Sequence, residues 1–168
     1  MPIDLGAMHM SANRSFEVQR TNHFEVIFEG FDEDVFPLAV TSASLPNSSN
    51  DPIELPYGNS KVKVAGQATT EDVSLTMKDF ITADTEKKLL GWRKKVYDPQ
   101  TQKVGWAEDY KKNGRVYLFG PDGTVIRTWR LLGCWPTSFE SSEFSYDGSD
   151  KREITMTISV DNAYIERE

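Results

Sequence analysis

Residues 153–160 read EITMTISV, and this stretch indicates the class of fold. Apolar residues at positions 154, 156, 158 and 160 alternate with threonine or serine at positions 155, 157 and 159. Successive side chains of a β-strand point to opposite faces of a sheet, so the period of two predicts a strand with one buried and one solvated face. We therefore expect a protein built on β-sheets.

Similar patterns run through much of the chain. Gly120-Pro121-Asp122-Gly123 separates two of the extended segments and is typical of a hairpin, because proline presets the first turn torsion and glycine tolerates a positive φ. Besides 153–160, extended segments are predicted at 24–28, 36–43, 61–65, 72–78, 114–119, 124–132, 132–139 and 143–146.

One helix is predicted over 83–97, because apolar residues recur there at helical spacing and basic residues follow toward the C-terminal end. The fold class expected is mainly β: an antiparallel β-sandwich or barrel with one flanking α-helix. The side chains predicted to form its structural core are Leu89, Trp92, Val96, Trp135, Ile154, Met156 and Ile158.

Length and composition limit the classes of protein to which the chain can belong. The 168 residues, 38% of them hydrophobic, fit one β domain over 16–168, preceded by an N-terminal arm over 1–15 that shows no regular pattern. The net charge of −7 disfavours a sequence-reading nucleic-acid binder. A single cysteine, Cys134, and a start without a secretory signal predict synthesis in the cytosol, and no apolar run is long enough to span a membrane.

Catalytic and metal-binding patterns are weak. His9 and His23 are the two histidines, and no zinc-ligand or phosphate-binding glycine motif occurs. Residues 147–150 are interpreted as a turn instead of a calcium loop, and the pair Glu140 and Glu143 as a solvated surface. We therefore predict no enzyme, no cofactor and no metal.

The segment 44–58 carries three prolines among polar residues and is predicted to be a long loop. Loops of this length in a compact domain usually have a function, and the edge strands of a sheet must be covered or used. A β domain with a long loop, an arm and no visible chemistry is typical of a subunit that assembles with copies of itself.

Four stretches then resemble one family. They are LPYGNSKVKVAG at 55–66, DVSLTM at 72–77, GCWPT at 133–137 and ITMTISVD at 154–161. Together, and in this order, they are similar to the tail tube proteins of contractile-tailed bacteriophages, which are related to the tube protein of type VI secretion. The resemblance covers most of 16–164.

The resemblance implies hexameric rings whose subunits share an inner β-barrel and stack into a tube inside a contractile sheath. Such a tube penetrates the host envelope and conducts viral DNA. The implied partners are further copies of the chain, the tail sheath protein, a baseplate or tube initiator and a tail terminator, with transient passage of DNA and no stable membrane association. The implied location is the virion tail, assembled in the host cytoplasm.

Two groups of residues are expected to serve this role. The ring-stacking loop is predicted to comprise Pro46, Asn47, Asp51, Pro52, Leu55, Pro56, Tyr57 and Gly58. The intersubunit or lumen-lining strands are predicted to include Phe36, Leu38, Val40, Lys61, Val62, Lys63 and Val64. An acidic lumen would repel DNA phosphates, which requires Lys61 and Lys63 to pair with acids across a subunit boundary.

Two alternatives remain open at this point. The same fold could form the inner tube of a type VI secretion or extracellular contractile injection system, whose cargo is protein. A chain of this composition could also be a small β-sandwich hydrolase or carbohydrate-binding module, which predicts a concave pocket lined by carboxyl groups with shifted pKa values.

Overall fold

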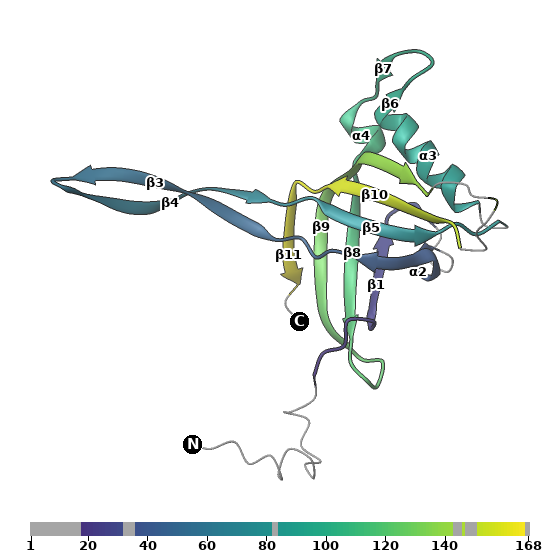
Figure 1. Cartoon of the computed structure of the whole chain (residues 1–168), viewed down its shortest axis with the longest axis horizontal. Coiled ribbons are helices and arrows are strands. Elements are labelled where there is room, and N and C mark those ends of the chain that lie inside the picture. Colours follow the sequence, from purple (N-terminus) through teal and green to yellow (C-terminus); the bar gives the residue numbers. More distant parts are fainter. Residues whose placement is uncertain (1–17, 32–35, 82–83, 143–145, 147–150, 167–168) are drawn as a thin grey trace, which may run out of the picture.

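The computed structural model describes residues 18–31, 36–81, 84–142, 146 and 151–166. Two antiparallel sheets share one long strand, β9 (Val125–Ser141), and their strands cross one another (Figure 1). This mainly β architecture with one long helix confirms the predicted fold class. The predicted arm over 1–15 and residues 143–145 of a predicted strand lie outside the described residues.

The two sheets differ in the half of β9 that they use. Sheet A contains, in order, β1 (Phe24–Phe28), β8 (Lys112–Phe119), the first half of β9 and β11 (Asn162–Glu166). Sheet B contains the second half of β9, then β10 (Glu153–Ser159), β5 (Val73–Lys78) and β2 (Val40–Ala43). All of these strand pairs are antiparallel.

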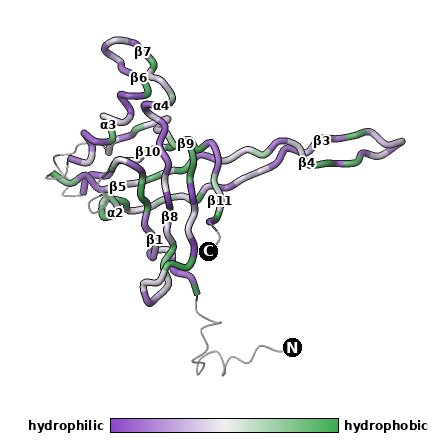
Figure 2. Tube along the Cα trace, turned by 180° about the vertical axis from the view of Figure 1, so that it is seen from behind, coloured by the Kyte–Doolittle hydropathy of each residue, from purple (hydrophilic) through white to green (hydrophobic). Residues whose placement is uncertain are grey.

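The hydrophobic core fills the space between the sheets. Ile154, Met156 and Ile158 of β10 are fully buried, and alternate residues of β1, β5 and β8 meet them there. Figure 2 shows the same alternation as changes of hydropathy along the strands. The period of two in EITMTISV therefore places its apolar residues in the core and its hydroxyl residues on the opposite face.

Helix α3 (Thr85–Val96) closes one end of the core, slightly shorter than the predicted 83–97. Trp92 is central to this contact: its ring lies 5.6 Å from Phe28 and 5.3 Å from Phe31, centroid to centroid. Its indole Nε1 donates a hydrogen bond to the Tyr110 carbonyl at 2.7 Å. The aromatic ring is thus packed while its one polar atom is satisfied.

Several predicted element boundaries were wrong. Residues 36–39 form a short helix, α2 (Phe36–Ala39), instead of extending β2, because Pro37 is compatible with the first turn of a helix. Residues 98–113, for which no element was predicted, contain most of a two-stranded ribbon and a short helix. These elements are β6 (Tyr97–Asp98), β7 (Lys103–Val104) and α4 (Ala107–Tyr110).

The predicted strands 124–132 and 132–139 are one strand, β9, that bends at Gly133. Gly133 has φ +65, and a Cβ there would collide with the Asp161 carboxylate. The bend lets β9 pair with β8 and β11 before Gly133 and with β10 after it. The GCWPT motif is therefore the point at which the chain passes from one sheet to the other.

Candidate functional site: an exposed hairpin

A two-stranded hairpin projects away from the two sheets. Its strands are β3 (Ser48–Tyr57) and β4 (Ser60–Thr70), and Gly58, with φ +59, lies in the turn at its tip. In sequence, β2 leads into β3 and β4 leads into β5, so the hairpin extends the edge of sheet B well beyond the core (Figure 1). Every residue of β3 is exposed.

The prediction of a loop over 44–58 was therefore wrong for most of this segment. Proline removes a backbone donor, which argues against a central strand but is compatible with an edge strand or a bulge. Pro52 lies at a register shift after Asn50, and Pro56 lies opposite Lys61 near the tip. The alternation of Ile53, Leu55 and Tyr57 is the sequence pattern that indicates a strand, but the neighbouring prolines are typical of a loop.

The hairpin has one apolar face and one polar face. The register places Ile53 opposite Val64 and Leu55 opposite Val62, with Tyr57 on the same side toward the tip. These five side chains are 43–76% exposed, and Figure 2 shows apolar segments along both strands. An exposed apolar row of this kind is typical of a contact surface for another protein.

On the polar face, one acid pairs with two bases within the hairpin. Lys61 Nζ lies 2.6 Å from Glu54 Oε2, and Lys63 Nζ lies 3.7 Å from Glu54 Oε1. Glu54 of the same hairpin thus faces both lysines and offsets one of their two charges, so an acid across a subunit boundary is needed for at most one of them. Exposed pairs of this type contribute little to stability but fix which face carries charge.

Asn47 and Glu71 join the two strands to each other at the base of the hairpin. The Glu71 backbone N–H donates to the Asn47 carbonyl at 2.8 Å, and Asn47 Nδ2 donates to Glu71 Oε2 at 3.2 Å. Pro46, the residue before Asn47, is buried. The hairpin thus leaves the sheet from an anchored position.

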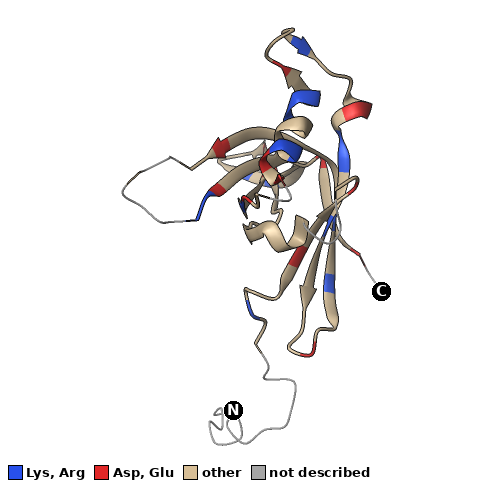
Figure 3. Ribbon diagram, turned by 90° about the vertical axis from the view of Figure 1, so that its right-hand side faces the viewer, with Lys and Arg blue, Asp and Glu red and all other residues tan. Residues whose placement is uncertain are grey.

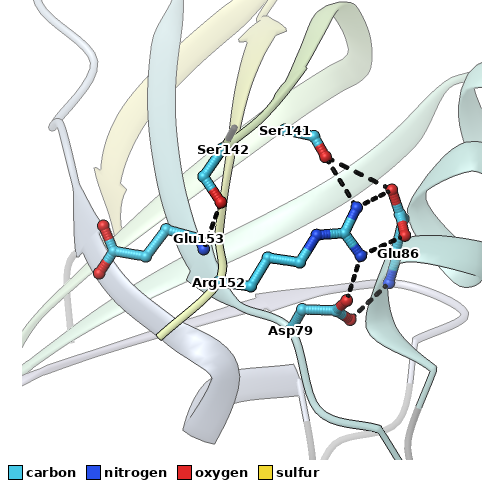
Figure 4. Close-up of polar contacts among 6 residues, drawn as sticks. All are labelled: Asp79, Glu86, Ser141, Ser142, Arg152 and Glu153. Atoms are coloured by element: carbon cyan, nitrogen blue, oxygen red, sulfur yellow. Dashed lines mark hydrogen bonds and ion pairs between the residues drawn. The ribbon is translucent and has the colours of Figure 1, made fainter. Parts of the chain in front are cut away.

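A second polar cluster lies at the opposite end of sheet B, beside α3 (Figure 4). Arg152 donates to both carboxylate oxygens of Glu86 at 2.7 Å, to Asp79 Oδ2 at 2.8 Å and to Ser141 Oγ at 2.9 Å. The hydrogen bond from Arg152 is the main cause that lowers the pKa of Glu86. The cluster joins the ends of β5 and β9 and the start of β10 to the first turn of α3.

The described residues do not assemble a recognisable catalytic or metal centre. Within them, no group of three or more His, Cys, Asp and Glu residues could hold a metal. His23 borders an open pocket whose Thr124 hydroxyl donates to Asp122 within a turn. Where a described carboxyl group has a shifted pKa, at Glu86 and Asp98, the pKa is lowered, whereas a general acid needs it raised.

Charge and hydropathy add two observations. Basic residues gather on the C-terminal half of α3, including Arg93, Lys94 and Lys95, where they complement the helix dipole (Figure 3). Among the helices in the described part of the chain, none has both the length and the apolar character needed to cross a bilayer.

Comparison with known proteins identifies the family. A family model described as T4-like virus tail tube protein gp19 matches residues 20–165, which include both sheets, α3 and the hairpin. The chain belongs to this family of tail tube proteins. It is 24% identical to the tail tube protein gp19 of Enterobacteria phage T4 over 154 residues, covering 89% of this chain and 93% of the T4 protein. The tail tube protein gp19 of Enterobacteria phage T6 is 23% identical over 154 residues, again covering 89% of this chain and 93% of the other protein.

Solved structures share the fold of this tail tube protein. One is the tube-terminating cap of the anti-feeding prophage, with a TM-score of 0.71, 22% identity and coverage of 90% of this chain and 93% of that one. Another comes from the sheath–tube complex of the extracellular contractile injection system PVC, with a TM-score of 0.69 and 19% identity. That match covers 98% of this chain and 99% of the PVC chain.

The structure brings together two groups of residues that the sequence analysis kept apart. In this tail tube protein, the residues predicted for ring stacking from Asp51 to Tyr57 lie on β3, and the lumen candidates Lys61–Val64 lie on β4 opposite them. Both groups belong to one hairpin. The residues predicted at its ends, Asn47 and Gly58, lie at its base and its tip.

The remaining candidates lie elsewhere. Phe36 is 5% exposed and Val40 is half-buried and packs against the core, whereas Leu38 is exposed. Of the predicted core residues, Trp135 is half-buried and its ring lies 5.9 Å from that of Tyr110. The others are buried: Leu89, Trp92, Val96, Ile154, Met156 and Ile158.

Proposed function

We propose that six copies of this tail tube protein join in a ring and that the rings stack into a hollow tube inside a contractile sheath. In this proposal, the sheath drives the tube through the host envelope and viral DNA passes along the bore. Membership of the tail tube family supports the proposal, and the exposed hairpin is the observation that carries it.

The hairpin is built to contact a second copy. Its longer strand has eleven residues and therefore extends for roughly 35 Å, at about 3.3 Å per residue. A lone subunit leaves the apolar row of Ile53, Leu55, Tyr57, Val62 and Val64 in water. Docking of this row on a neighbouring copy would bury it, and burial of apolar surface is the main driving force of association. In this proposal, rings stack through the β3–β4 hairpin instead of through the loop predicted from the sequence.

Several narrower features belong to the same proposal. The arm over 1–15 helps to hold the neighbouring copy, and the domain over 16–168 forms the tube wall. The sheath protein, a baseplate or tube initiator and a tail terminator are the partners. The tube is assembled in the host cytoplasm and becomes part of the virion, without catalysis and without stable membrane association.

Electron microscopy of the purified protein, alone and with tail extracts, tests the proposal. We expect annular particles or hollow rods with sixfold end views. Discrete monomers at every concentration, in the presence of tail extracts as well, would contradict it. Nucleic acid in the bore of tails, resolved by cryo-electron microscopy, separates a phage tail from an injection system that carries protein.

A further inference from the structure

An apolar patch is exposed on the segment that follows α3. This segment comprises β6, β7 and α4, residues 97–110, and we call it the knob. Trp106, between β7 and α4, is 79% exposed, and Val104 is 73% exposed. Tyr97, which lies opposite Val104, is exposed as well. Tryptophan and tyrosine are enriched among the residues that dominate the affinity of protein–protein contacts, so the knob has the composition of a contact surface.

The backbone of the knob is held in place. The Gly105 N–H donates to the Val96 carbonyl at 3.0 Å, and a Cβ at Gly105 would collide with the Lys95 carbonyl, so the ribbon lies directly against the end of α3. The Asp109 N–H donates to the Trp106 carbonyl at 3.0 Å, which fixes the tryptophan at the start of α4. A side chain presented by an ordered backbone loses less conformational entropy when it binds.

A groove lies between β2 and the part of sheet A that extends past it. Its volume is about 680 Å³, which is room enough for an aromatic ring. Leu45 is exposed in the groove, and the half-buried side chains of Phe24, Val40 and Leu118 also line it. These side chains are apolar, so the groove offers a surface that burial against another apolar group would stabilise.

The knob and the groove lie at opposite open edges of sheet B. In the described part of the chain, the second half of β9 and the strand β2 each pair on one side only. The knob projects beyond the second half of β9, whereas sheet A and the groove extend beyond β2 (Figure 1). Two different surfaces at opposite edges fit a head-to-tail contact, which closes a ring when the rotation divides a full turn.

The knob and the β3–β4 hairpin also project in different directions. The hairpin continues along the strands of sheet B, and the knob extends across them (Figure 1). Strands that join edge to edge place the next copy across the strands. The knob therefore points to a neighbour in the same ring, and the hairpin points out of that ring.

We propose that Trp106 and Val104 of one copy dock in the groove beside β2 of the next copy in the ring. Each subunit then gives one knob and receives one. This inference rests on the proposed tube function and adds a second contact to it, because the hairpin joins rings and the knob joins subunits within a ring.

Cysteine cross-linking of assembled rods tests the inference. Cys134 is buried, and burial raises the pKa of its thiol to about 12, so the unaltered protein serves as an unreactive background. The test variant combines Trp106→Cys with Leu45→Cys. The matched control combines Trp106→Cys with Tyr164→Cys, because Tyr164 lies on β11 outside the groove and is 42% exposed, against 39% for Leu45. A short bismaleimide links the thiols, and denaturing gels separate the products.

We expect the test variant to give a ladder of products in rods that ends at six copies, and no linked copies as a dilute free subunit. The control should give no ladder. A mixture of Trp106→Cys with Leu45→Cys, each as a single variant, should stop at pairs, because each copy then carries one half of the contact.

Three results would overturn the inference. Rods of the test variant that give no links would show that the knob and the groove do not meet. A ladder that continues past six copies would place the contact between rings. Links formed by Trp106→Cys alone, to another copy or to a sheath protein in the extract, would give the knob a different partner.

Tryptophan fluorescence of the unaltered protein decides the question if the cysteine variants form no rods. Trp92 is buried and Trp129 and Trp135 are half-buried, so Trp106 is the most exposed of the four indoles. We expect quenching by acrylamide to fall on assembly, and to fall much less in Trp106→Phe. Unchanged quenching in the unaltered protein, or an equal fall in Trp106→Phe, would overturn the inference.

These measurements also separate the inference from the proposed function. If the unaltered protein forms no rods with tail extracts, the tube itself is contradicted and the inference falls with it. If rods form while Trp106 stays as accessible to acrylamide as in the free subunit, the tube stands and another surface joins the copies of a ring.

Discussion

Arg152 is the residue through which sheet B holds its helix. Its guanidinium group reaches Glu86 of α3, Asp79 and Ser141. Planar guanidinium groups bind carboxylates through two parallel hydrogen bonds, which lysine cannot reproduce. We infer that this residue sets where α3 lies on the open end of the core.

Replacement of Glu86 by glutamine is expected to lower the melting temperature at pH 7. The folded-state pKa of Glu86 lies below its ordinary value of 4.5, so its ionised form stabilises the fold above that pH, and this contribution is lost as the pH falls through the folded-state pKa. The difference in melting temperature between Glu86→Gln and the unaltered protein should therefore be smaller at pH 3 than at pH 7.

Glu54→Gln is the control for this pH dependence, because Glu54 pairs with lysines on the exposed hairpin. We expect little change in its melting temperature at either pH. A difference between Glu86→Gln and the unaltered protein that grows in acid would contradict the assigned role of Glu86.

Two glycines are expected to respond oppositely to alanine. Gly133 has a positive φ and no room for a Cβ beside Asp161, so Gly133→Ala should destabilise the fold by roughly 1–3 kcal/mol. Gly91 is an exposed residue within α3 with open space around it, so Gly91→Ala should stabilise the fold by about 0.5–1 kcal/mol. Denaturant unfolding measures the change in the free energy of unfolding for each variant. Equal changes in the two variants would contradict the proposed bend at Gly133.

At the scale of elements, the hairpin and sheet B form one unit. β3 continues the edge strand β2, and β4 leads into the neighbouring strand β5, so a force on the hairpin tip is transmitted directly to sheet B. The register of the hairpin keeps its apolar and charged residues on opposite faces. Assembly should therefore depend on the apolar face of the hairpin and not on its charged face.

Leu55→Ser and Lys63→Ser test this dependence as a matched pair, since both side chains are exposed and lie on adjacent strands of the hairpin. We expect Leu55→Ser to reduce rod formation in sedimentation assays, because it removes apolar surface from the contact. Lys63→Ser should assemble nearly normally, and both variants should melt as the unaltered subunit does. Equal loss of assembly in both would argue against the apolar face as the contact.

At the scale of the whole molecule, assembly works against electrostatic repulsion. Each subunit carries a formal net charge of −7, so copies repel one another in dilute buffer. Raising the salt concentration from ~0.01 M to ~0.15 M shortens the screening length from about 30 Å to about 8 Å. Apolar contacts are not screened in this way.

We therefore expect salt to promote rod formation over this range, as measured by light scattering at constant protein concentration. Rods that dissolve as salt is raised would show that ion pairs between copies hold the tube together, which contradicts a contact made by the apolar hairpin face.

The sequence by itself was sufficient for the fold class. The patterns that indicate it are local in the chain. They are the strict alternation in 153–160 and 72–78, the helical spacing of Leu89, Trp92 and Val96, and the family resemblance. Local pattern reports which face of an element is buried, because burial selects apolar residues at every second or every third to fourth position.

The tertiary structure alone decided which strands pair and which surfaces remain uncovered. The strand over 48–57 was hidden because its prolines resemble loop residues, and β11 was not predicted because pairing with β9, more than its own pattern, makes it a strand. Arg152 and Glu86 are 66 residues apart, and the four strands of sheet B come from segments between Val40 and Ser159. Such groupings depend on contacts between segments far apart in the chain, which no single stretch of sequence encodes.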